Sequence, residues 1–147
     1  MRHPELVEQA MGRQALALLA TLDAEAFRQH PDYAIITSFP GLADNAGARV
    51  LAEIGDDRNR FADARALKAY AGPAPITRAS GRSISVTFRR VKNDRLAAAG
   101  WLWAFIAATH REPAKAHYRR RRDHGDRHST ARRHLLNRLL GQLYHCL

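Results

Sequence analysis

An apolar run of thirteen residues at positions 96–108, LAAAGWLWAFIAA, constrains the fold more than any other feature of the sequence. A helix needs about 20 apolar residues to cross a bilayer, so this run is too short to span one. We therefore expect a buried helix over residues 94–112. Within it, we expect Trp101, Trp103 and Phe105 to pack in the core, with stacking on nucleobases as the alternative.

Capping residues and helical spacing of apolar residues mark further segments. The predicted helices cover residues 5–28, 44–54, 64–70, 114–124 and about 129–144. Asp44 and Asp63 are the expected N-caps of the second and third of these, and Gly55 is the expected glycine after the second. Five leucines share one face of the last helix: Leu135, Leu136, Leu139, Leu140 and Leu143. The predicted fold class is mainly α, ending in a C-terminal helical bundle.

Residues 76–92 show a different pattern. Ile84, Val86 and Phe88 alternate with small hydroxyl residues, and a period of two is typical of a strand. A Ser80-Gly81 turn precedes this alternation. We therefore expect one short strand or extended arm in an otherwise helical chain.

The charge of the chain is unevenly distributed. Its 147 residues hold 24 Lys and Arg against 14 Asp and Glu, a net charge of +10. Residues 1–75 carry a net charge of −2 and residues 76–147 a net charge of +12. Of the basic residues, 21 are arginine, whose planar fork matches phosphate oxygens. With 46% apolar residues the chain is no disordered polyelectrolyte, so we expect one folded domain that binds nucleic acid through its second half.

Cysteine and histidine usage bears on metal sites. The single Cys146 excludes an internal disulfide framework and a cysteine-based zinc site. His124 and His128 are four residues apart, but Gly125 between them interrupts the predicted helix, so we expect no metal site on this chain. No secretory apolar run follows Met1, and we expect a cytoplasmic protein with no membrane partner.

The turn Phe39-Pro40-Gly41-Leu42, followed by a capped helix, resembles a helix-hairpin-helix element. In that element a glycine-containing turn presents backbone N–H groups to a DNA phosphate, so Gly41 is a candidate phosphate contact. Ala43 stands where a second glycine is usual. A plain turn between two helices is the alternative interpretation.

Five segments follow this turn in a characteristic order. They are Val50-Leu51-Ala52-Glu53-Ile54-Gly55-Asp56, Arg60-Phe61, Leu67-Lys68-Ala69-Tyr70-Ala71-Gly72-Pro73-Ala74-Pro75, Ser80-Gly81 and Val91-Lys92-Asn93. In this order and spacing, the chain resembles the C-terminal domain of a family of bacterial insertion-sequence transposases. These enzymes are related to Piv-type DNA invertases, are guided by a bridge RNA, and pair an N-terminal RuvC-like DEDD domain with a C-terminal serine-bearing domain.

The resemblance implies a recombination mechanism in which Ser80 attacks the DNA backbone and forms a covalent phosphoserine. Ser83 and Ser85 compete for that role. Mg²⁺ held by the DEDD domain would assist cleavage, and strand exchange would pass through a synaptic tetramer. The side chains expected to contact phosphates of DNA or guide RNA are Arg78, Arg82, Arg89, Arg90, Lys92, Arg95, Arg119, Arg120, Arg121 and Arg122.

The resemblance also predicts a domain division. We expect residues 1–32 to be the remnant of a coiled-coil linker helix and residues 33–147 to be the C-terminal transposase domain. Because no DEDD set is present, we expect a fragment, a truncated product or a decayed copy that holds no cofactor and does not cut DNA alone. Its partners would be DNA, guide RNA and a second copy or a full-length transposase.

Two alternatives remain open at this stage. The run at residues 119–122 is either a solvated helix face or a phosphate-binding surface. The whole chain is a serine-bearing recombinase domain, a non-catalytic nucleic-acid-binding module in which Ser80 only forms a turn, or a decayed transposase fragment without function.

Overall fold

The computed structural model describes residues 24–87 and 92–147. Residues 24–28 are helical, and the other elements follow in chain order. They are α2 (Tyr33–Thr37), α3 (Asp44–Ile54), α4 (Ala64–Ala71), β1 (Ile76–Ser80), β2 (Ser83–Thr87), α5 (Asp94–His110), α6 (Glu112–Asp123) and α7 (His128–Cys146). The mainly helical prediction is confirmed. Most of the predicted helix at residues 5–28 lies outside the described residues.

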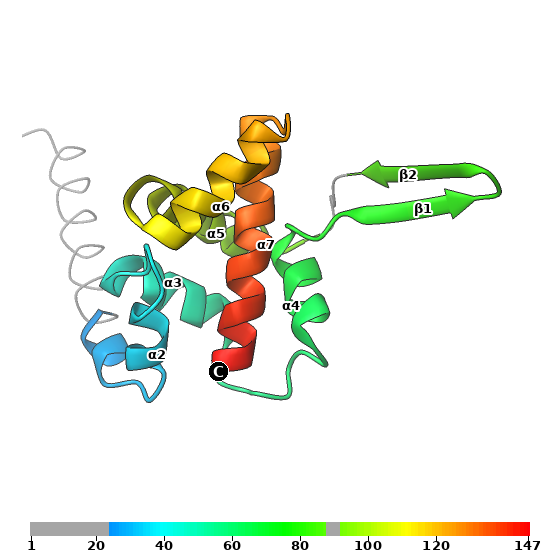
Figure 1. The fold of residues 1–147 in the computed structure, drawn as a ribbon. Coiled ribbons are helices and arrows are strands. Elements are labelled where there is room, and N and C mark those ends of the chain that lie inside the picture. Colours follow the sequence, from blue (N-terminus) through cyan, green and yellow to red (C-terminus); the bar gives the residue numbers. More distant parts are fainter. Residues whose placement is uncertain (1–23, 88–91) are drawn as a thin grey trace, which may run out of the picture.

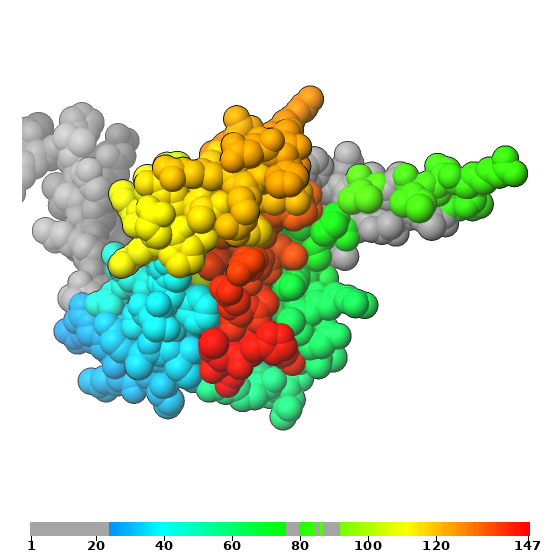
Figure 2. Space-filling model, in the orientation of Figure 1, coloured from blue at the N-terminus to red at the C-terminus, as the bar shows by residue number. Residues whose placement is uncertain are grey.

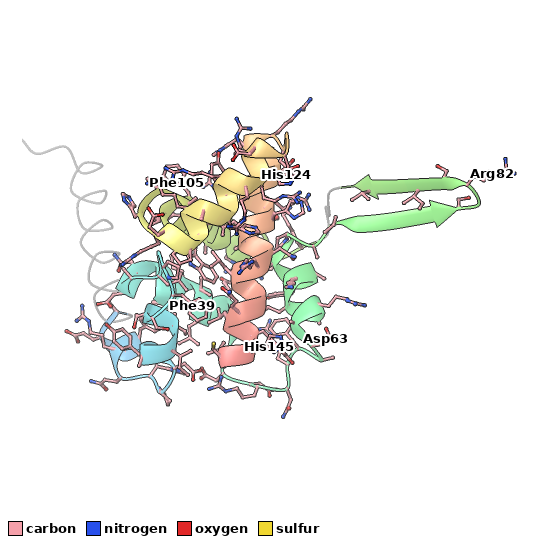
Figure 3. All side chains as sticks on the ribbon, viewed as in Figure 1. Phe39, Asp63, Arg82, Phe105, His124 and His145 are labelled. Carbon is pink, nitrogen blue, oxygen red and sulfur yellow. The ribbon has the colours of Figure 1, made fainter. Side chains whose placement is uncertain are left out.

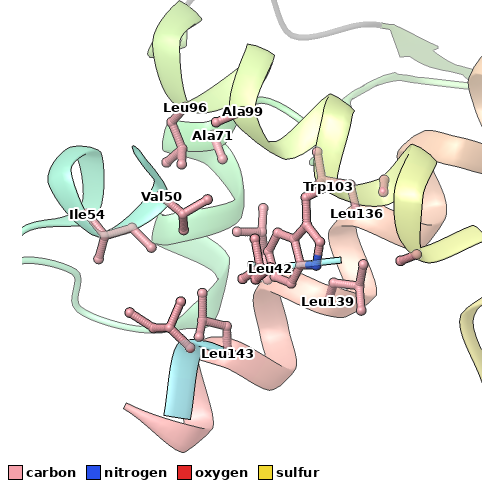
Figure 4. Packing of buried hydrophobic residues seen from close by; sticks show 14 of the residues in the cluster. Leu42, Val50, Ile54, Ala71, Leu96, Ala99, Trp103, Leu136, Leu139 and Leu143 are labelled. Atoms are coloured by element: carbon pink, nitrogen blue, oxygen red, sulfur yellow. The ribbon is translucent and has the colours of Figure 1, made fainter. Parts of the chain in front are cut away.

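Helix α7 forms the centre of the helical body. It packs against α4, α5 and α6, and α3 also packs against α5 (Figure 1). All five leucines predicted to share one face of α7 are buried. They meet the buried residues of α3 and α5 in one hydrophobic cluster, shown from close by in Figure 4. The core therefore fixes how the helices stand relative to one another.

Trp103 lies at the middle of this core. Its side chain is 0% exposed, and its indole Nε1 donates a hydrogen bond of 2.7 Å to the carbonyl oxygen of Pro40. Trp101 and Phe105 are 37% and 46% exposed, so the prediction that they pack in the core is wrong. The reason is that α5 is apolar all round, whereas its neighbours cover only the side that carries Trp103.

The turn at Pro40-Gly41 is packed against α5. Gly41 has a φ of +87°, and a Cβ there would lie 3.0 Å from the carbonyl oxygen of Trp103 and 3.1 Å from the amide nitrogen of Ala107. Glycine is therefore required both by the backbone conformation and by the close approach of the helix. This packing joins α2 and α3 to the rest of the body.

The structure corrects some of the predicted helix ends. Ala43, not Asp44, is the N-cap of α3. Asp44 is instead the first residue of that helix, where it accepts hydrogen bonds from Tyr33 Oη at 2.7 Å and Arg28 Nε at 2.8 Å. The prediction at Asp63 is confirmed, because its carboxylate accepts a bond of 2.8 Å from the amide of Ala66.

Helices α5 and α6 meet at a short junction. Helix α5 ends at His110, and Arg111 is extended, so that α6 begins at Glu112, two residues before the predicted start. Pro113 fits in the first turn of α6 because no intrahelical hydrogen bond needs its missing N–H there. At the other end of α5, Asn93 is the N-cap and accepts a bond of 2.8 Å from the amide of Leu96.

Two antiparallel strands replace the single strand that the sequence predicts. β1 and β2 pair so that Ser80 stands opposite Ser83, and Gly81 and Arg82 form the loop between them. Gly81 has a φ of +56°, which suits the first position of a two-residue hairpin turn. The predicted turn at Ser80-Gly81 is therefore confirmed, with a strand on each side of it.

Candidate nucleic-acid interface

The β1–β2 hairpin is an arm that projects away from the helical body (Figures 1 and 2). Ser80, Gly81, Arg82 and Ser83 are all exposed at its tip, and Figure 3 shows Arg82 at the far end. No atom lies within 4 Å of the position that a Cβ on Gly81 would take. The tip can therefore enter a groove or a partner's surface without displacing any other described part of the chain.

The hydroxyl group of Ser80 has no hydrogen-bond partner among the described residues. A serine hydroxyl is a weak nucleophile unless a base takes its proton or cations stabilise the charge that develops in the transition state. Ser83 faces it across the hairpin, and Ser85 stands opposite Arg78 in the strand register. The tip thus exposes the Ser80 and Ser83 side chains to solvent, and no basic side chain among the described residues bonds to the Ser80 hydroxyl.

Hydrogen bonds fix both roots of the arm to the helical body. Before β1, the carbonyl oxygen of Pro73 accepts a bond of 3.2 Å from Arg133 Nη1 of α7. After β2, the amide of Asn93 donates a bond of 2.8 Å to the carbonyl oxygen of Tyr70, the penultimate residue of α4. Asn93 Nδ2 donates a further bond of 2.7 Å to Tyr70 Oη. These bonds tie Pro73, before β1, and Asn93, after β2, to α7 and α4.

The predicted phosphate contacts Lys92 and Arg95 lie at this root. Lys92 Nζ is 3.6 Å from a carboxylate oxygen of Asp94, and Arg95 Nε is 3.5 Å from one of Glu53. The Arg95 side chain remains 85% exposed, and ion pairs at exposed positions are weak, so it can turn towards a phosphate. The side chain of Arg78, and Arg89 and Arg90 entirely, lie outside the described residues.

The structure divides the arginine run of α6 into two pairs. Arg121 binds the carboxylate of Asp126, with Nε at 2.6 Å, and Arg122 Nη1 donates a bond of 2.8 Å to the carbonyl oxygen of the same residue. These two side chains therefore hold the turn between α6 and α7. Arg119 and Arg120 are exposed, and their guanidinium groups have no partner in the described part of the chain.

Basic side chains gather over α6 and the first half of α7, where Figure 3 shows many nitrogen-tipped sticks. Residues 111–138 contain ten Lys and Arg against three Asp and Glu. Such an excess of one sign creates a positive potential that attracts a polyanion. This surface and the arm together form the candidate nucleic-acid interface.

The turn at Gly41 is a less suitable phosphate contact than the sequence predicts. Its backbone faces α5, and the carboxylate of Asp44 occupies the first turn of α3, where a phosphate would have to lie. Two negative charges at one helix N-terminus repel each other. The structure gives Gly41 a packing role, and its contact with nucleic acid stays a prediction.

The charges of nearby arginines act on two histidines of α6 and α7, His117 and His134. The described residues contain no group of three or more His, Cys, Asp or Glu side chains that could hold a metal ion. Burial lowers the pKa of His117, and the charges of nearby arginines lower it further. Burial likewise lowers the pKa of His134, with Arg121 as the next cause. Both side chains are therefore neutral at pH 7.

Acidification is expected to destabilise the fold through these two histidines. Because their pKa values are lower in the folded chain than the unfolded value of about 6.5, the unfolded chain binds protons more readily. The contribution of these two histidines to the free energy of unfolding should be fully present above about pH 6.5 and should decrease as the pH falls below that value. Thermal melts between about pH 7.5 and pH 5.5, where carboxylates stay ionised, should show a falling Tm.

The double variant His117→Gln, His134→Gln provides the control for this prediction. Its melting temperature should change much less across that range, because it lacks the two histidines whose pKa values are lowered on folding. An unchanged pH dependence in this variant would contradict the assignment.

The sequence profile described as "Transposase IS116/IS110/IS902 family" matches residues 33–119, from the first residue of α2 into α6. The chain belongs to this transposase family. The match covers the arm with Ser80, its root with Lys92 and Arg95, and the first arginine of the α6 run. No helix in the part of the chain that the structure describes is long and apolar enough to cross a membrane.

Three relatives show how far the similarity extends. The "Mini-circle putative transposase for IS117" of Streptomyces coelicolor is 62% identical over an alignment of 154 positions. The alignment covers 96% of this chain and 37% of the relative. The "Insertion element IS900 uncharacterized 42 kDa protein" of Mycobacterium paratuberculosis is 38% identical, over 82% of this chain and 30% of its own length. The "Insertion element IS110 uncharacterized 43.6 kDa protein" of Streptomyces coelicolor is 32% identical, over 92% and 33%. The chain thus spans about a third of the length of each relative.

The residues that bond to the roots of the arm could not be predicted from the sequence. Tyr70, Asn93 and Arg133 come from three separate segments, which only the fold brings to these roots. Asn93 alone carried a usable signal, because asparagine directly before a helical segment is a preferred N-cap.

Proposed function

We propose that this chain is the nucleic-acid-binding, serine-bearing domain of an insertion-sequence transposase, in which the arm delivers Ser80 to a DNA phosphodiester. One observation carries the proposal: Ser80 is exposed at the tip of an arm whose roots are bonded to the helical body, inside the segment that matches the family. The partners are the transposon and target DNA and a guide RNA, and the basic surface over α6 and α7 binds their phosphates.

The proposed reaction is a transesterification. The hydroxyl oxygen of Ser80 attacks the phosphorus, the bond from phosphorus to one deoxyribose oxygen breaks, and that oxygen leaves as a strand-end hydroxyl after taking up a proton. The proton of Ser80 passes to a base. The product is a phosphoserine ester, which a hydroxyl of another strand end attacks to rejoin DNA and free Ser80. The exposed guanidinium of Arg82, two residues away, supports the charge on the phosphoryl oxygens.

The described residues do not provide the proton acceptor or the metal ion that this reaction needs. These residues contain no metal-binding cluster, and none of their basic side chains bonds to Ser80. We therefore place the proton acceptor, and the Mg²⁺ that the family resemblance implies, outside them. On this proposal the chain binds nucleic acid alone and cleaves DNA only when the other groups are supplied.

Nucleic-acid binding by the purified chain tests the first part of the proposal. The dissociation constant for duplex DNA and for structured RNA should rise steeply with salt, because counterions are released from each neutralised phosphate. Absence of binding at low salt, in a chain with a net charge of +10, would contradict the proposal. Detection of a covalent DNA adduct on Ser80 tests the second part.

Replacing Arg119 and Arg120 by alanine together should weaken binding to a similar degree for all sequences. Each phosphate contact contributes about 0.9 to the slope of log K against log salt, so the slope should flatten by about 1.8. A salt titration of fluorescence anisotropy measures both quantities.

The matched control replaces two arginines of the acidic half, Arg49 and Arg65, which are also exposed. This double variant loses the same charge but should change the slope by much less. Equal losses in the two double variants would show that only the net charge matters and that α6 forms no binding surface.

A non-catalytic binding module is the alternative function. The observation that favours it is that the Ser80 hydroxyl has no partner among the described residues that would activate it. On this alternative, Ser80→Ala changes neither binding nor recombination when the remaining transposase domain is supplied in trans.

A further inference from the structure

A cavity of about 210 Å³ lies at the root of the arm, where α4, α5 and α7 come together. Ala97 and Leu136 contribute apolar surface to it, and Trp101 an aromatic ring. Lys92, Ser129 and Arg133 contribute polar groups, and no acidic residue is among those that line it. The cavity therefore combines an aromatic ring, an apolar floor, a hydroxyl group and two cations.

The indole ring of Trp101 is held in place from outside the cavity by Arg132. The guanidinium carbon of Arg132 lies 4.1 Å from the centroid of the indole ring. Arg132 also donates hydrogen bonds of 3.0 Å and 2.6 Å to the carbonyl oxygen of Trp101. A ring fixed in this way loses little conformational freedom when a second planar group stacks on it.

The cations around the cavity match an anionic ligand. Lys92 and Arg133 line it, and Arg132 adjoins it through Trp101. Lys92 Nζ is 3.6 Å from a carboxylate oxygen of Asp94, a residue that does not line the cavity. Partial burial lowers the pKa of Arg132 and Arg133, which means that both cations lack part of their hydration. A phosphate at the rim would add charge-assisted hydrogen bonds to such cations.

The size and chemistry of the cavity select one class of ligand. Pockets for drug-sized molecules measure about 300–1,000 Å³, so this one suits a single ring system with a small substituent. A helix or a base pair is too large. An aromatic ring beside cations is the arrangement on which proteins stack the bases of single strands.

We propose that this cavity binds one unpaired nucleobase, stacked on Trp101, with its phosphate at the cationic rim formed by Lys92 and Arg133. This inference rests on the proposed nucleic-acid binding and deepens it by naming the structure that is recognised. The cavity adjoins both roots of the arm, because Pro73 before β1 and Lys92 after β2 both line it. A base held there anchors a strand beside the arm that carries Ser80.

The test compares a hairpin duplex that has one bulged nucleotide with the same duplex fully paired, each made as DNA and as RNA. The wild-type chain should prefer the bulged duplex by about tenfold, which is the size expected for one stacked base. Trp101→Ala should abolish that preference and leave the affinity for the paired duplex unchanged. Trp101→Phe should restore part of it. The DNA and RNA versions show which strand supplies the base.

Phe105→Ala is the matched control. Phe105 lies on the same helix, is similarly exposed, and also has Arg132 over its ring at 4.8 Å, but it does not line the cavity. This variant should keep the full preference for the bulge. A bulge with an abasic site should bind the wild-type chain no better than the paired duplex does.

Two results would overturn the inference. One is a wild-type chain that binds both duplexes equally, and the other is a Trp101→Ala variant that keeps the preference. Either leaves the proposed function intact, whereas failure to bind any nucleic acid contradicts that function itself. If Trp101→Ala does not fold, quenching of wild-type tryptophan fluorescence by the bulged but not the abasic duplex provides the decision, because Trp103 is fully buried.

Discussion

Replacing Ser80 by alanine is expected to abolish covalent attachment of the chain to DNA and to lower strand cleavage by about 10³-fold or more. The hydroxyl oxygen is the proposed attacking atom, and alanine has no atom that can replace it. The measurement is formation of a denaturation-resistant DNA–protein adduct, with the remaining transposase domain supplied in trans. Peptide mapping of the adduct identifies the modified residue.

Ser83→Ala is the internal control. Ser83 stands opposite Ser80 in the hairpin and is equally exposed, so the two variants alter the arm in the same way. Both should bind DNA as the wild type does, because neither hydroxyl has a bonding partner in the described part of the chain. An adduct that is lost in Ser83→Ala and kept in Ser80→Ala would reverse the assignment, and loss in neither would favour the non-catalytic module.

Replacing Trp103 by alanine is expected to lower the free energy of unfolding by about 3–5 kcal/mol. The indole is completely buried, and its hydrogen bond to Pro40 is lost with it. A domain of this size is stable by about 5–15 kcal/mol, so the loss is a large fraction of its total stability. Chemical denaturation followed by circular dichroism measures the change.

Trp101→Ala provides the comparison two residues away on the same helix. Trp101 is 37% exposed, and the guanidinium group of Arg132 stacks on its ring. Such a cation–π contact contributes about 0.5–2 kcal/mol. Its free energy of unfolding should therefore fall by much less. Similar losses for both variants would show that the two faces of α5 are equally packed, contrary to the structure.

Local sequence signals predicted most of the helices, but they did not predict which face of every helix is buried. Asp63 and Gly55 mark helix ends by themselves, and the leucines of α7 reveal its buried face by their spacing. The buried face of α5 could not be inferred in this way, because a helix that is apolar all round has no periodic signal. Tertiary packing decides which side is buried: the turn at Pro40-Gly41 and the neighbouring helices cover Trp103, whereas Trp101 stays partly exposed.

The same limit applies to the candidate site. The turn at Ser80-Gly81 follows from local preferences, but strand β1, with the sequence ITRAS, lacks a clear alternation and depends on pairing with β2. The division of the α6 arginines depends on Asp126, which the turn at Gly125 brings back against Arg121. The cavity at the root of the arm needs three helices that are distant in the sequence, so no local pattern could predict it.

The shape of the arm also bears on how the domain behaves in solution. Each of its strands pairs with only one neighbour among the described residues, so that a row of backbone amides and carbonyls is open on either edge. Ile84 and Val86 are 72% and 62% exposed beside these edges. Open edges with β-branched side chains promote strand-to-strand association, which makes self-association through the arms the main hazard when the domain is concentrated without nucleic acid. The reach of the arm and this tendency to aggregate have the same structural origin.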